Sequence, residues 1–115
     1  MTNPPEIPIV FFRTRAGNEP VRDWLRELGS EDRRAIGLDL MRVQTGWPIG
    51  MPLCRSLGGG LWEVRSGLPS HRIARLIFVM RQGTIYIVHG FIKKSQVTPQ
   101  ADLDLARTRA KEMDA

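Results

Sequence analysis

The C-terminal half of the chain contains three consecutive segments rich in apolar and β-forming residues, separated by short turns, which predicts a β-meander. We expect its strands at Leu61–Ser66, His71–Arg81 and Thr84–Ile92. Only Gln82-Gly83 separates the last two, a length and composition typical of a tight hairpin. The last strand is apolar on both faces: Ile85, Ile87 and Phe91 point one way, and Tyr86, Val88 and Ile92 the other. Such a strand is expected inside the sheet.

The N-terminal half combines a short strand with two helices. Ile7 to Thr14 is an apolar run rich in β-formers and predicts a strand. Helices are predicted at residues 18–29 and 30–46, because apolar residues recur there at helical spacing: Val21, Trp24, Leu25, Leu28, Ile36, Leu40 and Val43. Their connection, Gly29-Ser30, is short, which favours a helical hairpin of antiparallel neighbours.

The remaining segments complete a single α+β domain spanning residues 1–115. Residues 46–60 are rich in glycine and proline and are expected to form a loop that ends in a turn at Gly58–Gly60. A last helix is expected after Thr98-Pro99, with Leu103, Ala106, Ala110 and Met113 on its apolar face. The predicted order is β-α-α-β-β-β-α.

The positive charge of the chain is concentrated in the meander. The net charge is +5, and residues 55–97 alone carry seven basic side chains and one acid, Glu63. The basic residues are Arg55, Arg65, Arg72, Arg75, Arg81, Lys93 and Lys94. This distribution favours a polyanionic partner such as nucleic acid, although scattered solvated arginines are the simpler alternative.

Strand alternation separates these cations into two faces. Glu63 and Arg65 share one face of their strand, whereas Arg72 is expected opposite Arg75 and Arg81. Arg65, Arg72 and the pair Lys93-Lys94 all lie at strand ends, where they can converge on a phosphate.

The titratable residues near this cluster admit more than one interpretation. His71 lies beside the cluster and is a candidate proton donor or acceptor, as much as a solvated side chain. We expect His89, which follows an apolar run, to make a core hydrogen bond. Glu63 is either a structural ion-pair partner, which we favour, or a general base.

Other chemistries find little support in the sequence. Two histidines and one cysteine stand at no metal-ligand spacing, so no metal or cofactor is expected. The chain has neither a nucleophile elbow nor a GxGxxG motif. The lone Cys54, the lack of a signal sequence and the lack of a long apolar run favour a cytoplasmic protein without membrane contact.

The segments LWEVR, HRIARLIF and IVHGFIKKSQVTP, followed by a helix of alternating acids and bases, resemble the HigB-like, phage-derived branch of the RelE/ParE toxin superfamily. The resemblance implies a small RelE-like fold with a twisted, mainly antiparallel sheet. It implies a toxin of a type II toxin–antitoxin module that cleaves mRNA on the ribosome without metal, by attack of the ribose 2′-hydroxyl on the adjacent phosphate. Its implied partners are the ribosome, mRNA and a helix-turn-helix antitoxin similar to HigA, and a heterotetramer of toxin and antitoxin is one arrangement that the resemblance allows.

Carried onto this sequence, the resemblance assigns catalysis to Arg65, Arg72, His71 and Lys94. RNA or ribosome contacts are expected from Lys93, Arg75, Arg81 and Arg55. Lys94 is expected to share a pocket with Arg72, and Lys93 to point to the opposite face if the strand continues through both lysines. The alternatives are a non-enzymatic gyrase inhibitor like ParE and a non-toxic phage-derived accessory protein.

Overall fold

The elements expected from the sequence are present, together with one additional strand. The computed structural model describes residues 6–94 and 96–113. Its elements are β1 (Ile9–Phe11), α1 (Pro20–Glu27), α2 (Ser30–Gly46), β2 (Cys54–Gly58), β3 (Leu61–Gly67), β4 (Ile73–Arg81), β5 (Thr84–Ile92) and α3 (Gln100–Met113).

Strand β2 lies in the segment that the sequence predicted to be a loop. It pairs antiparallel with β3, with Arg55 opposite Glu63 and Ser56 opposite Trp62. A five-residue edge strand between prolines and glycines has a weak local signal, and its pairing is decided by the neighbouring strand. The expected turn at Gly58–Gly60 is confirmed, with φ values of 85°, 61° and 84° that glycine adopts without strain.

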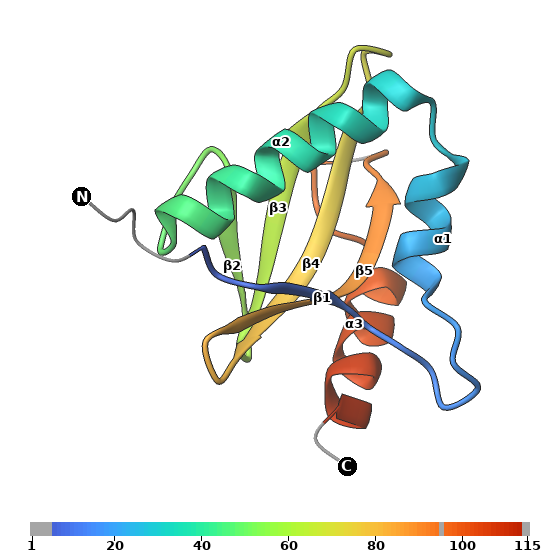
Figure 1. The fold of residues 1–115 in the computed structure, drawn as a ribbon, viewed down its shortest axis with the longest axis vertical. Helices are drawn as coiled ribbons and strands as arrows, with labels where there is room; N and C mark the ends of the chain where they lie inside the picture. The colour runs from blue at the N-terminus through green and yellow to red at the C-terminus, as the bar shows by residue number, and fades with distance from the viewer. Residues whose placement is uncertain (1–5, 95, 114–115) are drawn as a thin grey trace.

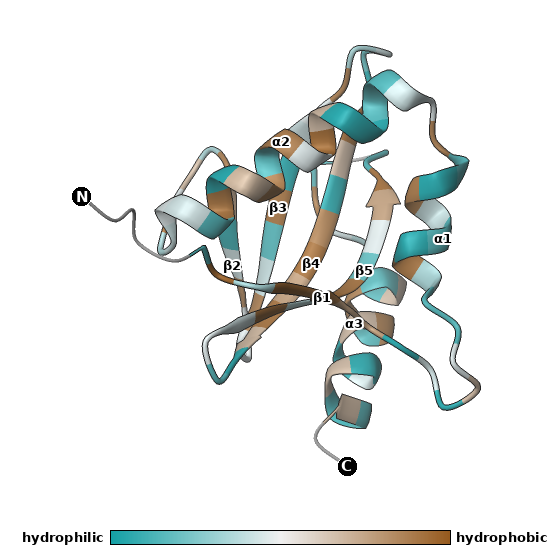
Figure 2. Cartoon of the chain, in the orientation of Figure 1, coloured by the Kyte–Doolittle hydropathy of each residue, from teal (hydrophilic) through white to brown (hydrophobic). Residues whose placement is uncertain are grey.

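The sheet is mixed, with the strand order β1-β5-β4-β3-β2. Strand β1 runs parallel to β5, and every other neighbouring pair is antiparallel. Strand β5 therefore lies inside the sheet, as its two apolar faces predicted. Figure 2 shows the central strand β4 as mostly hydrophobic, in keeping with its place between β3 and β5.

A β-bulge in β5 changes which face its last residues occupy. The register skips Val88, since Phe78 pairs with Ile87 whereas Ile77 pairs with His89. Ile85 and Ile87 pack with α1 and α2, but Phe91 packs against the α3 core and Ile92 against the other. This corrects the strict alternation expected for β5, because a bulge adds one residue and reverses the facing of those that follow.

Helices cover both faces of the sheet (Figure 1). Val21 and Leu25 of α1 and Ile36, Leu40 and Val43 of α2 share one core with the inner faces of β3, β4 and β5. Ala106 and Ala110 of α3 share the second core, on the opposite face, with Leu61, Ile77 and Val79. Helix α3 lies behind one end of the sheet and covers only part of this second face (Figure 1).

The expected packing of α1 against α2 is wrong. The two helices diverge from their joint: α1 packs on β5 and α2 packs on β3, with few contacts between the helices (Figure 1). Each helix buries its apolar stripe against the sheet, which offers a larger apolar surface than a neighbouring helix does.

Candidate anion-binding site

A groove opens at the end of the sheet where the β3–β4 turn meets the chain leaving β5. Its volume is about 510 Å³, and it is lined by His71, Arg72, Ile73, Lys93, Lys94 and Gln96. The amide of Lys93 donates to the carbonyl of Ile73 at 2.7 Å, which extends the β4–β5 pairing past the end of β5 and fixes the two walls. Three cations and no carboxylate are among the described residues that line this phosphate groove, as we call it.

Arg72 is held at the phosphate groove by Asp32 of α2. Its Nη2 lies 3.1 Å from Asp32 Oδ2, and its Nε donates to Ser70 Oγ at 3.1 Å. The hydroxyl of Ser70 in turn donates to Asp32 Oδ2 at 2.7 Å. These contacts lower the pKa of Asp32, chiefly through the Ser70 hydrogen bond and further through Arg72, against the opposing effect of burial. An ion pair with a half-exposed arginine adds little stability, so its main effect is to orient Arg72.

Behind the groove, the α3 face of the sheet carries a basic cluster built around Glu63. Its members are Arg55, Arg65, Arg75 and Lys93. Glu63 is fully buried, and its Oε1 lies 3.5 Å from both Arg55 Nη2 and Arg75 Nε. Its other oxygen accepts a hydrogen bond from Thr98 Oγ1 at 2.7 Å. One carboxylate thus faces four cations, which leaves the cluster strongly positive.

Arg75 is the most deeply buried member of the basic cluster. Its Nη1 donates to Thr98 Oγ1 and its Nη2 to the carbonyl of Gln96, both at 3.0 Å. These bonds tie the segment between β5 and α3 to the sheet. Arg75 therefore shapes the phosphate groove from behind, through the backbone position of Gln96.

Lys93 joins the basic cluster to the phosphate groove. Its pKa is lowered, first by burial and then by repulsion from Arg65 and Arg75. Arg65 lies directly opposite Arg75 across β3 and β4, and its buried Nε has no hydrogen-bond partner among the described residues. Like charges across a strand pair are unfavourable, and an anion bound nearby would offset their repulsion.

We expect a bound anion to raise the pKa of Lys93. The lowered pKa means that protonated Lys93 disfavours folding at neutral pH, and that this cost falls as pH rises toward the ordinary value of 10.5. An anion in the groove compensates Arg65 and Arg75, so the charged form of Lys93 becomes easier to keep. A pH titration of the lysine side chains by NMR, with and without inorganic phosphate, measures this shift. Lys111, exposed on α3, should not shift, and an unmoved Lys93 would show that phosphate does not enter the groove.

The structure separates the predicted site residues into distinct places. Arg72, His71 and both lysines line the phosphate groove, whereas Arg65 stands in the basic cluster behind it. Arg75 is buried and bonded, which corrects its expected role as a surface contact for RNA. Arg55 is half-buried and paired with Glu63 and Thr98, so it too is mainly a cluster member.

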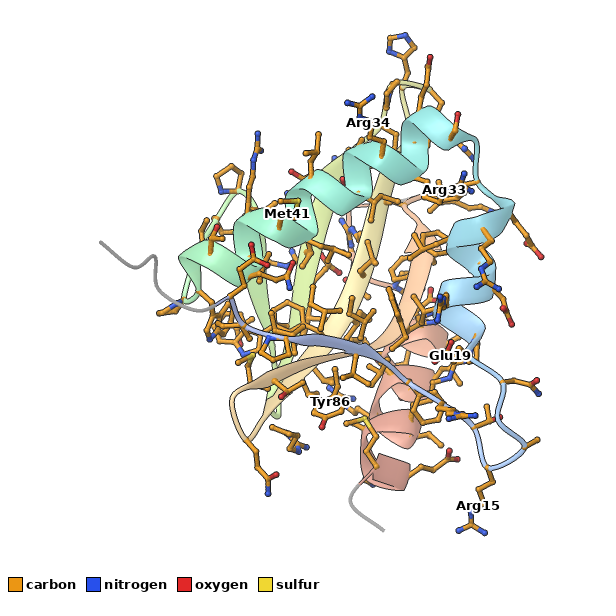
Figure 3. All side chains as sticks on the ribbon, in the orientation of Figure 1. Arg15, Glu19, Arg33, Arg34, Met41 and Tyr86 are labelled. Carbon is orange, nitrogen blue, oxygen red and sulfur yellow. The ribbon has the colours of Figure 1, made fainter. Side chains whose placement is uncertain are left out.

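Arg81 lies at the other end of β4 and is not part of the groove. It lines a separate hollow with Val10, Phe12, Tyr86 and Met113. Figure 3 shows Tyr86 near the lower part of α3, far from the β3–β4 turn at the top. The length of β4 separates Arg81 from the groove, so a contact of Arg81 with RNA or the ribosome would lie outside the groove, and that contact stays a prediction.

The expectation that the strand continues through Lys93 and Lys94, and turns them to opposite faces, is also corrected. Strand β5 ends at Ile92, and both Lys93 and Lys94 line the phosphate groove. The bulge at Val88 places Lys93 on the face of Arg65 and Arg75, while Lys94 also reaches the side of α1. Lys93, which was expected to contact RNA or the ribosome, thus also faces the arginines of the basic cluster.

The titratable residues are placed in line with their simpler interpretations, except His71. Glu63 is a structural counter-ion, and His89 is half-buried with its Nε2 2.6 Å from Asp102 Oδ1. His71 lines the groove from an exposed turn position with φ of 64°, where glycine would be unstrained. A strained non-glycine residue at a groove is a reason to look for function in its side chain.

Sequence reasoning missed three residues of the site. The sequence pattern singled out neither Asp32 nor Gln96, and Thr98 stood only at the expected start of the last helix. Asp32 and Thr98 are almost fully buried polar residues that contact arginines from distant segments. Only the buried Thr98 had a local signal, since it stands beside the basic segment and before Pro99.

Two further properties bear on the chemistry. Within residues 6–94 and 96–113, no three His, Cys, Asp or Glu side chains gather in a way that could hold a metal ion. Over the same residues, no helix is both long and apolar enough to cross a bilayer.

Comparison with known proteins gives a family. Residues 23–111 match the family described as phage derived protein Gp49-like (DUF891), whereas curated proteins give no match. This family is part of the RelE/HigB-like toxin superfamily and is associated with the toxins of toxin–antitoxin systems. The match spans α2, β2 to β5 and most of α1 and α3, so it includes every residue of the phosphate groove and the basic cluster. The chain therefore belongs to the Gp49-like family of phage-derived proteins.

Proposed function

We propose that this protein is a ribosome-dependent mRNA endoribonuclease, the toxin of a type II module on the HigB-like branch. The observation that carries the proposal is the phosphate groove, where Arg72, Lys93 and Lys94 meet without a lining carboxylate among the described residues. A groove of this kind favours a phosphodiester over an acidic protein helix, because its charges lie in a concave space at one end of the sheet.

The chemistry needs charge stabilisation more than it needs a nucleophile from the protein. The ribose 2′-oxygen attacks the adjacent phosphorus, the bond to the 5′-oxygen breaks, and the products are a 2′,3′-cyclic phosphate and a 5′-hydroxyl. Negative charge grows on the non-bridging oxygens during attack, and Arg72 and Lys93 are placed to stabilise it. The 2′-hydroxyl gives up one proton and the 5′-oxygen gains one, and His71 is our candidate to transfer one of them.

We propose that the ribosome orients the mRNA for the attack. A shallow groove on a small protein binds RNA without fixing the line of attack, whereas an mRNA held on the ribosome is already oriented. We therefore propose that the protein acts in the cytoplasm on translating ribosomes. We propose that a helix-turn-helix antitoxin of the HigA type neutralises it by covering the positive surface in a heterotetramer.

The proposal predicts cleavage of messages during translation. Brief expression without a partner protein should arrest growth and produce new transcript ends within coding regions. With purified protein, an mRNA on programmed ribosomes should be cut faster than the same mRNA free in solution, leaving cyclic phosphate ends. Growth arrest with intact messages and broken DNA would instead indicate a gyrase inhibitor, and unimpaired growth would indicate an accessory protein.

A further inference from the structure

A second groove adjoins the phosphate groove and shares Lys94 with it. It has a volume of about 360 Å³ and lies between α1, the outer edge of β5 and the start of α3. Its lining comprises Trp24, Gly90, Phe91, Ile92, Lys94, Pro99 and Asp102. We propose that it binds one nucleobase of a single-stranded RNA whose neighbouring phosphate occupies the phosphate groove. The proposal rests on the proposed function for its choice of RNA as the ligand.

The second groove exists because β1 covers only part of β5. Strand β1 pairs with Ile85 to Ile87, so within the described part of the chain no strand pairs with the outer edge of β5 beyond Val88. The bulge at Val88 then turns Ile92 toward the α1 side of the sheet, and Lys94, past the end of β5, lines the groove together with Trp24 of α1. The open edge is flanked by α1 and by the first turn of α3.

Two aromatic residues line this groove, Trp24 from the α1 side of the sheet and Phe91 from the α3 side. The six-membered ring of Trp24 lies against Gly90, where an added Cβ would stand 2.7 Å from Cζ3 and 2.9 Å from Cε3. Gly90 is therefore required for the position of Trp24. Phe91 stacks on His89 with ring centroids 5.4 Å apart, and His89 is fixed by Asp102. Fixed aromatic rings that line a groove are the usual platform for an unstacked RNA base.

The charges of the second groove favour a base over a second phosphate. Asp102 contributes a carboxylate, which repels a phosphate but accepts a hydrogen bond from an exocyclic amino group. Lys94 stands where the two grooves meet, so a phosphate bound there is followed directly by the aromatic groove. A base with an amino group, adenine, cytosine or guanine, thus fits better than uracil.

Binding of a non-cleavable RNA tests the base site separately from cleavage. The probe is a fluorescent single-stranded RNA hexamer with 2′-O-methyl riboses, compared with versions that lack one base at each position in turn. For the wild-type protein we expect one position at which loss of the base weakens binding about 5- to 150-fold. In Phe91→Ala, loss of that base should cost almost nothing further, since the stacking partner is already absent.

Three variants control this measurement. Tyr86→Ala removes an aromatic ring from the far end of the sheet and should keep the full dependence on the base. Lys94→Ala should weaken intact and abasic RNA by the same factor, because it contacts the phosphate. Gly90→Ala displaces Trp24 without removing a ring and should reduce the base dependence, with thermal melting confirming that each variant folds.

The outcomes separate the base site from the proposed function. The base site would be overturned if binding depended on the base equally in Phe91→Ala and the wild type, or if binding by the wild type did not depend on any base. The open edge of β5 would then be a pairing site for a strand of a protein partner. If Phe91→Ala removes the dependence of binding on the base, but the wild-type protein leaves messages uncut, the base site is retained and the nuclease is rejected. If the wild-type protein cuts messages, but Phe91→Ala keeps the full dependence of binding on the base, the nuclease is retained and the base site is rejected.

Discussion

Lys93→Ala is expected to slow cleavage of a ribosome-bound message about 10²–10³-fold, the usual cost of removing one charge-stabilising donor from a transition state. Lys93 is placed for this role because it lines the phosphate groove and faces Arg65 and Arg75. The measurement is single-turnover cleavage with saturating ribosomes, so that weaker binding does not contribute to the rate. Since protonated Lys93 is repelled by its neighbours, the variant should fold at least as well as the wild type.

Lys111→Ala is the matched control for Lys93→Ala. It removes the same charge from an exposed position in the last turn of α3, and its single-turnover rate should equal that of the wild type. Lys94→Ala should reduce affinity for RNA, and its dependence on salt, more than the cleavage rate. A normal rate in Lys93→Ala together with a large loss in Lys94→Ala would reverse these assignments.

Glu63→Gln is expected to lower the free energy of unfolding by about 3–5 kcal/mol, because it leaves buried cations without their counter-ion. Glu63 is fully buried and contacts Arg55, Arg75 and Thr98, so glutamine keeps its shape and loses its charge. A loss of this size is a large part of the 5–15 kcal/mol that stabilises a typical domain. Urea unfolding followed by circular dichroism measures it.

Glu27→Gln provides the comparison for Glu63→Gln. Glu27 is exposed at the end of α1, and its replacement should change the free energy of unfolding by less than about 0.5 kcal/mol. Sulfate should stabilise Glu63→Gln more than the wild type, because a more positive cluster binds an anion more tightly. Equal stability of Glu63→Gln and the wild type would mean that the carboxylate does not hold the cluster together.

The sequence by itself determined the elements that have a strong local pattern. The central strands are runs of mostly apolar, β-forming residues bounded by turns, and α1, α2 and α3 carry apolar stripes at helical spacing. The assignment of Glu63 and Arg65 to one face, and of Arg75 to the same side as Ile77 and Val79, is confirmed. The type of each element and the facing of its side chains follow from the local pattern of residues, and therefore they can be predicted from the sequence. Because the ends of the strands could be predicted, the cationic residues at those ends could be identified as well.

Tertiary structure decided which of those cations meet. The bulge at Val88 depends on the register between β4 and β5, and it places Lys93 rather than Lys94 beside Arg65 and Arg75. Asp32 reaches Arg72 from 40 residues away in the chain, and Thr98 reaches Glu63 from 35. Such contacts leave no periodic signal, because burial and pairing of distant segments create them. The sequence thus identified most of the cationic residues of the site, whereas their arrangement in space depends on the packing of the sheet and α2.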